Sequence, residues 1–182
     1  MPDSRGHPPL EDVKQRVITA ICMLYRHDRD LLDVDANERS ITHKLAEHLQ
    51  REFSDWHVDC EYNRRRDLIK RLQIDFGKID ADDIEAKTVF PDIIVHRRQT
   101  EQNLLVIEVK KDNGQEGTKD IEKLKKFTTV PEYQYQYGLF LRLNETGATR
   151  LKLYQRGDFA GDWTGDLQRA LKELGHGGWG DD

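Results

Sequence analysis

The chain has 182 residues and a mass of 21.3 kDa, with 35% charged and 36% apolar residues, which predicts one compact domain with a limited core. Its longest apolar run, residues 17–25, is shorter than the roughly 20 residues of a membrane span, and Met1–His7 lacks the apolar stretch of a secretory signal, so we expect a cytoplasmic protein without a membrane partner. The net charge is −5, and residues 158–182 carry −4 of it (six acidic, two basic), so the overall charge neither favours nor excludes a polyanionic partner.

Two helices are expected in the first third of the chain, after a disordered lead over residues 1–10. Residues 11–28 have apolar side chains at helical spacing, and residues 11–32 would form an N-terminal helical extension. Asn37 is a good N-cap for a second helix. The apolar stripe of that helix consists of Ile41, Leu45, Leu49 and Phe53. Cys22 and Cys60 have no metal-ligand spacing, so they are expected to be reduced thiols in the core.

The rest of the chain alternates between strands and helices. Strands are expected over residues 58–62, 90–95, 104–110, 133–141 and 151–154, and short helices over residues 118–128 and 166–174. The charged residues 64–87 indicate a long loop or an insertion, and residues 175–182 a flexible tail. This order predicts a single α/β domain over residues 11–174, with a central mixed β-sheet flanked by helices.

Charged residues interrupt two of the expected strands. Asp92 lies in the apolar run 90–95, and Glu108 and Lys110 end the run 104–110. A buried charge is costly unless it is paired or holds a metal. Residues two apart in a strand share a face, so Glu108 and Lys110 point the same way, and Asp92 on a neighbouring strand would converge with them. Oxygens from Asp92, Glu108 and the Val109 carbonyl, completed by water, suit Mg²⁺, and Lys110 would lie beside the metal-bound water.

This pattern resembles that of the PD-(D/E)XK nuclease superfamily, whose fold is called restriction-endonuclease-like. The motif here is Pro91-Asp92, fifteen intervening residues, and then Glu108-Val109-Lys110. The family's core of helix, three strands, helix and strand (αβββαβ) is similar to the order expected between residues 37 and 143. The resemblance implies a nuclease in which Asp92, Glu108 and Lys110 are catalytic, with Mg²⁺ as the cofactor and Mn²⁺ as a substitute.

Members of this family often supply a further carboxylate from the helix before the first strand. At about 100° per residue, Glu38 lies within roughly 60° of the apolar stripe, whereas Glu47 lies about 180° away and should face water. We therefore expect Glu38 to join Asp92, Glu108 and Val109 around the metal, with Glu52 as a weaker candidate. Two alternatives stay open. In the first, Glu38 only stabilises the N-terminus of its helix through the helix dipole. In the second, Asp92, Glu108 and Lys110 form a partly buried ion pair at the ends of two edge strands.

Other polar residues are weaker candidates for substrate contacts. These are Lys111, Lys119, Lys123, Lys126, Gln134 and Gln136, with basic clusters at residues 64–66 and 97–98. A solvated charged face is the more common explanation for such lysines. Alternating tyrosines at residues 133–137 favour a core strand face over base stacking, and Gln134 and Gln136 do not fit the Gln-x-x-x-Tyr element of the family's exonuclease branches. Zinc spacing and a phosphate-binding glycine loop are absent from the sequence.

The sequence thus leads to two functional hypotheses. The first is a Mg²⁺-dependent, endonucleolytic nuclease acting on DNA, with RNA as an alternative substrate. One such centre cuts one strand, so a double-strand break would need a homodimer or two events. The second is an inactive module of the same fold that binds nucleic acid or a protein partner, because fold does not guarantee function.

Overall fold

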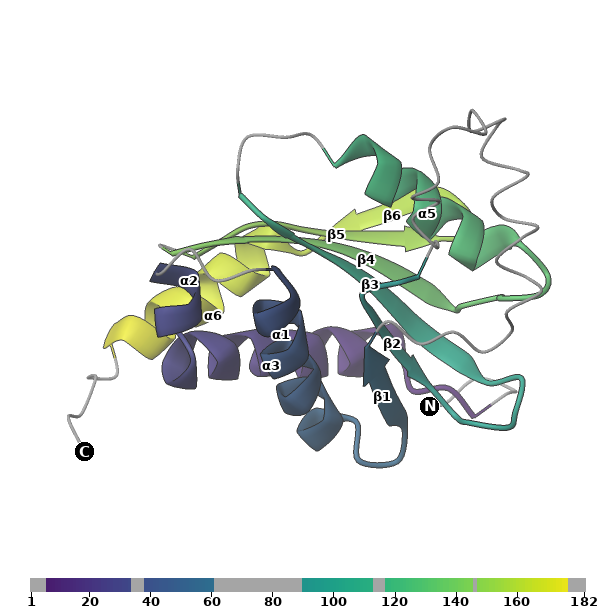
Figure 1. Ribbon diagram of the computed structural model, residues 1–182, viewed down its shortest axis with the longest axis horizontal. Helices are drawn as coiled ribbons and strands as arrows, with labels where there is room; N and C mark the ends of the chain where they lie inside the picture. The colour runs from purple at the N-terminus through teal and green to yellow at the C-terminus, as the bar shows by residue number, and fades with distance from the viewer. Residues whose placement is uncertain (1–5, 34–37, 61–89, 113–116, 146, 177–182) are drawn as a thin grey trace, which may run out of the picture.

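The computed structural model describes residues 6–33, 38–60, 90–112, 117–145 and 147–176. In chain order the elements are α1 (Leu10–His27), α2 (Asp30–Asp33), α3 (Glu38–Glu52), β1 (His57–Cys60), β2 (Ile93–His96), β3 (Asn103–Lys111), α5 (Thr118–Thr129), β4 (Tyr137–Asn144), β5 (Gly147–Gln155), β6 (Asp158–Asp162) and α6 (Thr164–His176). Figure 1 shows their arrangement. The predicted α/β class with a mixed sheet packed by helices is confirmed.

Within the described residues, six strands form one sheet in the order β1-β2-β3-β4-β5-β6. Neighbouring strands are antiparallel except β3 and β4, which are parallel and are connected through α5. A parallel pair requires such a crossover, whereas an antiparallel pair can be joined by a short turn. The register places Glu108 beside Phe140 and Lys110 beside Arg142. β3 is therefore an interior strand, and its carboxyl end, where the charged residues lie, pairs with β4 alone because the pairing with β2 ends at Ile107.

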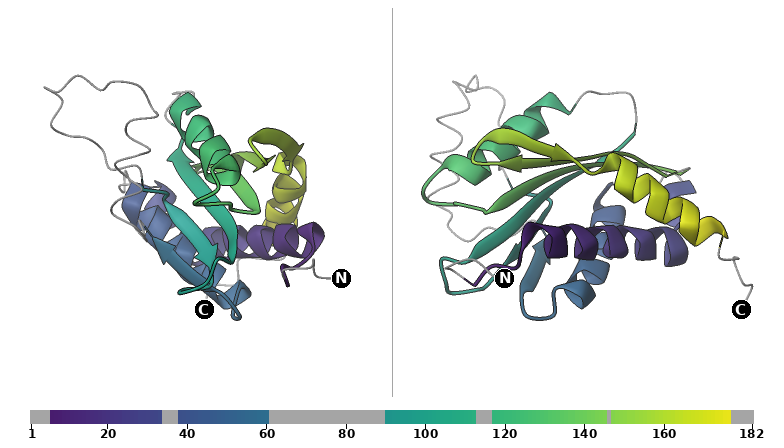
Figure 2. Two further views of the ribbon diagram at one scale, coloured as in Figure 1. Left: turned by 90° about the vertical axis from the view of Figure 1, so that its right-hand side faces the viewer. Right: turned by 180° about the vertical axis from the view of Figure 1, so that it is seen from behind.

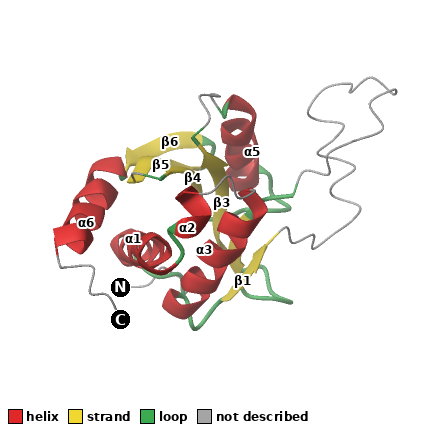
Figure 3. Cartoon of the chain, turned by 60° about the vertical axis from the view of Figure 1, so that its left-hand side comes forward, coloured by secondary structure: helices red, strands yellow, loops and turns green. Residues whose placement is uncertain are grey.

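Helices cover both faces of this sheet. α1, α3 and α6 pack on one face and α5 on the other, as the view from behind makes clear (Figure 2). In Figure 3 the strands lie between α5 and the pair α1 and α3. Alternate residues of β3 serve the two faces: Leu105 and Ile107 belong to the core under α1 and α3, and Val106 to the smaller core under α5. Glu108 and Lys110 follow Val106 at intervals of two, so they share its face.

The start of α1 differs from the expected disordered lead. Residues 6–9 are described, and the side chain of His7 is only 2% exposed, with its ring centroid 5.7 Å from that of Trp56. Leu10 is already helical. Part of the predicted lead therefore packs against the turn that follows α3, because an aromatic partner lies within reach there.

Two strand predictions need correction. β4 begins at Tyr137 rather than residue 133, because the amides of Tyr133 and Gln134 both donate to the Val130 carbonyl in a turn, and Gln134 has φ +42°. β6 was not predicted at all. Its sequence, residues 158–162, is mostly exposed and lacks an apolar alternation. It forms because Arg156 and Gly157 both have positive φ, the backbone of a two-residue hairpin that returns the chain onto β5.

The other expected elements are present, since α5 and α6 cover residues 118–129 and 164–176 and β1 covers residues 57–60. Two of the expected strands have different bounds: β2 begins at Ile93, so that Asp92 precedes it, and β5 is longer than expected. Trp163, which directly precedes α6, is a buried core residue. The proposed cap Asn37, the charged stretch 64–87 with its basic residues 64–66, and the tail from residue 177 lie outside the described residues.

Gly117, which precedes α5, allows a close approach between this helix and β4. Its φ is +47°, and a Cβ there would lie 2.6 Å from Cζ of the buried Phe140 ring. We expect Gly117→Ala to lower the free energy of unfolding by about 2–4 kcal/mol, from left-handed strain plus overpacking. Urea denaturation would measure it. Gly165→Ala is the control: with nothing within 4 Å and a helical position, it should leave stability unchanged or slightly higher. Equal stability of the two variants would contradict this account.

Candidate active site

The end of β3 places two charged side chains on the α5 face of the sheet. Glu108 is completely buried, whereas the Lys110 side chain is 31% exposed. Between its polar ends the strand is otherwise apolar, with residues 104–107 and 109 all buried. Apolar residues with a high propensity for strands explain why this segment forms an interior strand. The site is thus a charged end on a hydrophobic strand, with Glu108 inside and Lys110 reaching towards solvent.

Asp92 joins them from the start of β2. It directly precedes Ile93, which pairs with Ile107 on the antiparallel strand β3. Its Oδ2 accepts a 2.7 Å hydrogen bond from the amide of Val109. This bond fixes the carboxylate next to Glu108, as expected from the hairpin. The contribution of the Val109 carbonyl to a metal site stays a prediction.

Glu38 reaches the same place from the first residue of α3. Its Oε1 accepts a 3.0 Å hydrogen bond from the Lys110 ammonium, and its Oε2 accepts one of 3.3 Å from the amide of Lys111. The side chain of Glu38 is 37% exposed, so it lies at the rim rather than in the apolar interior. The structure therefore brings Glu38 to the predicted cluster, where its partners are the end of β3 and Lys110.

Helix α5 adds two residues that complete the cluster. The Lys123 ammonium lies 2.6 Å from Glu108 Oε2, a close ion pair. Asp120 lies between the two lysines, with Oδ2 3.7 Å from Lys110 and Oδ1 3.5 Å from Lys123. Sequence reasoning missed Asp120 and grouped Lys123 with solvated lysines. The available signal was the helical spacing of Asp120 four residues before Leu124, a core position.

Burial and charge shift the acidity of these groups. Burial and the neighbouring Asp92 raise the pKa of Glu108 well above its usual value, against the attraction of Lys123. Burial also raises the pKa of Asp92, although the Val109 hydrogen bond opposes it. Burial alone would lower the pKa of Lys110, but the hydrogen bond to Glu38 and the charge of Asp120 outweigh it, so the pKa is raised. Lys110 is therefore an ammonium ion at neutral pH.

The cluster carries more negative than positive charge. Four acidic side chains (Glu38, Asp92, Glu108 and Asp120) meet two lysines, so the cluster has a formal charge of −2 when all four acids are ionised. Within the described residues, Glu108 Oε1 is buried and accepts no hydrogen bond. A divalent cation would balance this charge, and oxygen donors are those Mg²⁺ prefers.

A metal would have few direct protein ligands here. Among the described residues, no group of three or more His, Cys, Asp or Glu side chains is placed to hold a metal ion. Mg²⁺ typically needs only one or two carboxylates and keeps several waters. The residues therefore fit an ion held through Asp92 and Glu108, whereas Glu38, predicted as a third ligand, is engaged by Lys110 and Lys111.

Several predicted substrate contacts are placed elsewhere. Gln134 is exposed in the turn before β4, and the amide of Gln136 donates to the Asn103 carbonyl at the start of β3, the end opposite the site. Lys119 is exposed on α5, and Lys126 lies in its last turn. Lys111 is half-buried beside Lys110. The tyrosines divide between the two cores, since Tyr135 lies under α5 and Tyr137 under α1 and α3.

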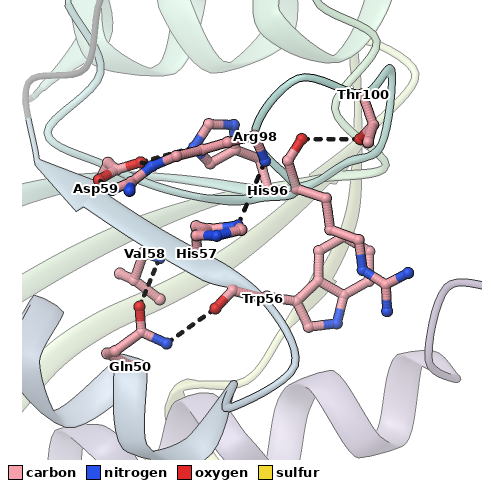
Figure 4. Close-up of polar contacts among 9 residues, drawn as sticks. Gln50, Trp56, His57, Val58, Asp59, His96, Arg98 and Thr100 are labelled. Atoms are coloured by element: carbon pink, nitrogen blue, oxygen red, sulfur yellow. Dashed lines mark hydrogen bonds and ion pairs between the residues drawn. The ribbon is translucent and has the colours of Figure 1, made fainter.

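A second polar cluster lies at the other end of β2 (Figure 4). Asp59 on β1 accepts hydrogen bonds from His96 Nε2 at 2.8 Å and from Arg98 Nε at 3.0 Å, and a further one from Arg98 Nη2. The guanidinium of the neighbouring Arg97 lies over the Trp56 ring, 4.7 Å from its centroid. These arginines are therefore engaged with protein groups, and the cluster joins β1 to the turn after β2.

Asp59 should make stability depend on pH. Burial alone would raise its pKa, but the hydrogen bonds from Arg98 and His96 outweigh this and lower it. A lowered folded-state pKa stabilises the protein above the unfolded value, about 3.8, and this stability is lost as the pH falls through the folded value. We expect Asp59→Asn to lower the free energy of unfolding by about 1–3 kcal/mol at pH 7, and by progressively less below about pH 4. Thermal melts at several pH values would show this.

The exposed Asp55, in the turn before β1, gives a matched control. Asp55→Asn should melt like the unaltered protein across the same pH range. A deficit of Asp59→Asn that stays constant down to pH 3 would contradict an electrostatic role of this carboxylate.

No protein-family model matches the chain, and no curated protein matches it in sequence. Among the described helices, none combines the length and the apolar composition needed to cross a membrane.

Proposed function

We propose that this protein is a divalent-metal-dependent nuclease that hydrolyses phosphodiester bonds in DNA, endonucleolytically, with a restriction-endonuclease-like core. The observation that carries the proposal is the meeting of Asp92, Glu108, Lys110 and Glu38 from three separate elements at the end of β3. The order α3-β1-β2-β3-α5-β4 supports it, because it matches the helix, three strands, helix and strand implied by the resemblance.

Each residue has a role in this proposal. Asp92 and Glu108 would hold Mg²⁺, for which Mn²⁺ would substitute; the bound ion supplies Lewis acidity and lowers the pKa of its water. Lys110 is charged, so it would orient the attacking water and attract the substrate phosphate rather than take a proton. Glu38 positions the Lys110 ammonium through their 3.0 Å hydrogen bond. The partial exposure of Lys110 leaves its ammonium accessible to a phosphate from solvent.

The test is cleavage of supercoiled plasmid by the purified protein in Mg²⁺, in Mn²⁺ and in EDTA. Nicked circles that appear with either metal and disappear with EDTA are the expected result. Single-stranded, branched and RNA substrates would follow in the same assay. Complete absence of cleavage on all of them would overturn the proposal.

One observation favours a second candidate, a non-catalytic module that binds nucleic acid or a protein partner. The charged cluster contains its own cations, since Lys110 contacts Glu38 and Lys123 contacts Glu108. An ion-paired cluster can serve structure alone. Gel-shift binding of the plasmid with no cleavage and no effect of Mg²⁺ on thermal stability would favour this module over the enzyme.

A further inference from the structure

Lys123 is the closest cation to the buried Glu108 carboxylate among the described residues. The ammonium lies 2.6 Å from Glu108 Oε2, and the lysine side chain is 19% exposed while that of Glu108 is 0% exposed. A carboxylate without solvent is costly unless a cation compensates it. Lys123 thus provides to Glu108 the charge that a divalent ion would otherwise provide.

A Mg²⁺ ion held by Glu108 would therefore compete with the Lys123 ammonium for this carboxylate. The ion brings two positive charges and its own waters, and the ammonium brings one charge on a flexible stem. Keeping both beside Glu108 would place like charges together in a poorly solvated site, which is unfavourable. Binding of one cation therefore disfavours the other.

The structure also contains a second partner for Lys123. Asp120 lies one helical turn before it on α5, with Oδ1 3.5 Å from the ammonium. A lysine that leaves Glu108 can stay near Asp120 without losing its counter-ion, because the two residues share one face of the helix. This alternative partner lowers the cost of exchanging the ammonium for a metal ion.

We propose that Lys123 is an internal counter-cation that competes with the divalent ion for Glu108, so that metal binding displaces its ammonium towards Asp120. The inference rests on the proposed metal site at Asp92 and Glu108. In the metal-free protein Lys123 keeps the buried carboxylate compensated. It also lowers the apparent affinity for metal, so that the site responds to the divalent-ion concentration.

The test is isothermal titration calorimetry with Mn²⁺ and with Mg²⁺ on four full-length proteins. These are the unaltered chain, Lys123→Met, Lys125→Met and Lys123→Met combined with Glu108→Gln. Methionine keeps an unbranched apolar stem without the charge. Lys125 is exposed on the same helix and contributes nothing to the cluster, so it is the matched control. Circular dichroism of each variant checks that it is folded.

We expect Lys123→Met to bind the ion about tenfold more tightly or better, from a coupling of neighbouring charges. Lys125→Met should bind as the unaltered protein does, and the added Glu108→Gln should remove the gain. If the unaltered protein binds the ion and folded Lys123→Met binds it equally or more weakly, the competition is overturned and the metal site stands. Absence of binding in every protein would overturn the metal site and the competition together. If Lys123→Met is unfolded, Lys123→Gln replaces it with the same expectations.

Discussion

Lys110→Ala should lower the rate of plasmid cleavage by about 10²–10³-fold at saturating Mg²⁺, the effect typical of losing one preorganised electrostatic group. The ammonium lies at the rim of the site with its charge ensured by Glu38 and Asp120, so its loss removes attraction for the phosphate and orientation of the water. Stability should change by no more than about 1 kcal/mol, because the side chain is partly exposed and surface ion pairs contribute little. Initial rates of nicking, with thermal melts of the same samples, would measure both.

Lys172→Ala is the control for this substitution, since Lys172 is exposed on α6, which packs on the opposite face of the sheet. It should cleave like the unaltered protein. Lys110→Arg keeps the charge with a different shape and should retain part of the activity if the role is electrostatic. Undiminished cleavage by folded Lys110→Ala would remove this lysine from the mechanism.

The charged residues on the strands were predictable because they break a strong local pattern. β3 is an apolar run of high strand propensity, so Glu108 and Lys110 at its end stand out, and the same holds for Asp92 before β2. Period-two alternation then places Glu108 and Lys110 on one face without knowledge of the fold. The position of Glu38 was also predictable from the sequence, because the apolar stripe of α3 is regular.

For the residues on α5, the local pattern gave only a weak signal, the helical spacing between Asp120 and Leu124. Asp120 and Lys123 stand in a segment full of lysines and acids, and only the packing of α5 over β3 and β4 distinguishes the inward pair from exposed Lys119 and Lys125. That packing depends on contacts distant in sequence, such as the close approach of Gly117 to Phe140. Long-range packing likewise decides the burial of His7, and an exposed edge strand such as β6 carries little hydrophobic signal.

The partnership of Lys123 and Glu108 leads to opposite expectations for the two functional hypotheses. If the attraction between Glu108 and Lys123 dominates, as in a structural ion pair, removal of the Glu108 charge leaves Lys123 with Asp120 alone and lowers the free energy of unfolding by up to about 3–5 kcal/mol. If the cluster is a metal site with surplus negative charge, the same change relieves repulsion with Asp92 and the cost of burying a carboxylate. Asp120 limits the loss at Lys123, because it lies 3.5 Å from the ammonium.

Glu108→Gln should therefore raise the stability of the metal-free protein at pH 7 by about 1–2 kcal/mol, or roughly 2–8 °C in melting temperature. The pKa of Glu108 is raised by burial and by Asp92, so the ionised side chain penalises the folded state at neutral pH, and a neutral amide does not. Mg²⁺ at 100 times its Kd should stabilise the unaltered protein by about 2.7 kcal/mol and the variant by much less. Thermal melts with Mg²⁺ or EDTA would measure both effects.

Glu122→Gln is the matched control, because Glu122 is exposed on α5. It should melt like the unaltered protein in EDTA and gain the same stability from Mg²⁺. A loss of several kcal/mol in metal-free Glu108→Gln, together with no effect of Mg²⁺ on the unaltered protein, would identify the cluster as a structural ion pair. That outcome would favour the binding module, because without a metal at Glu108 the site lacks the means to activate water.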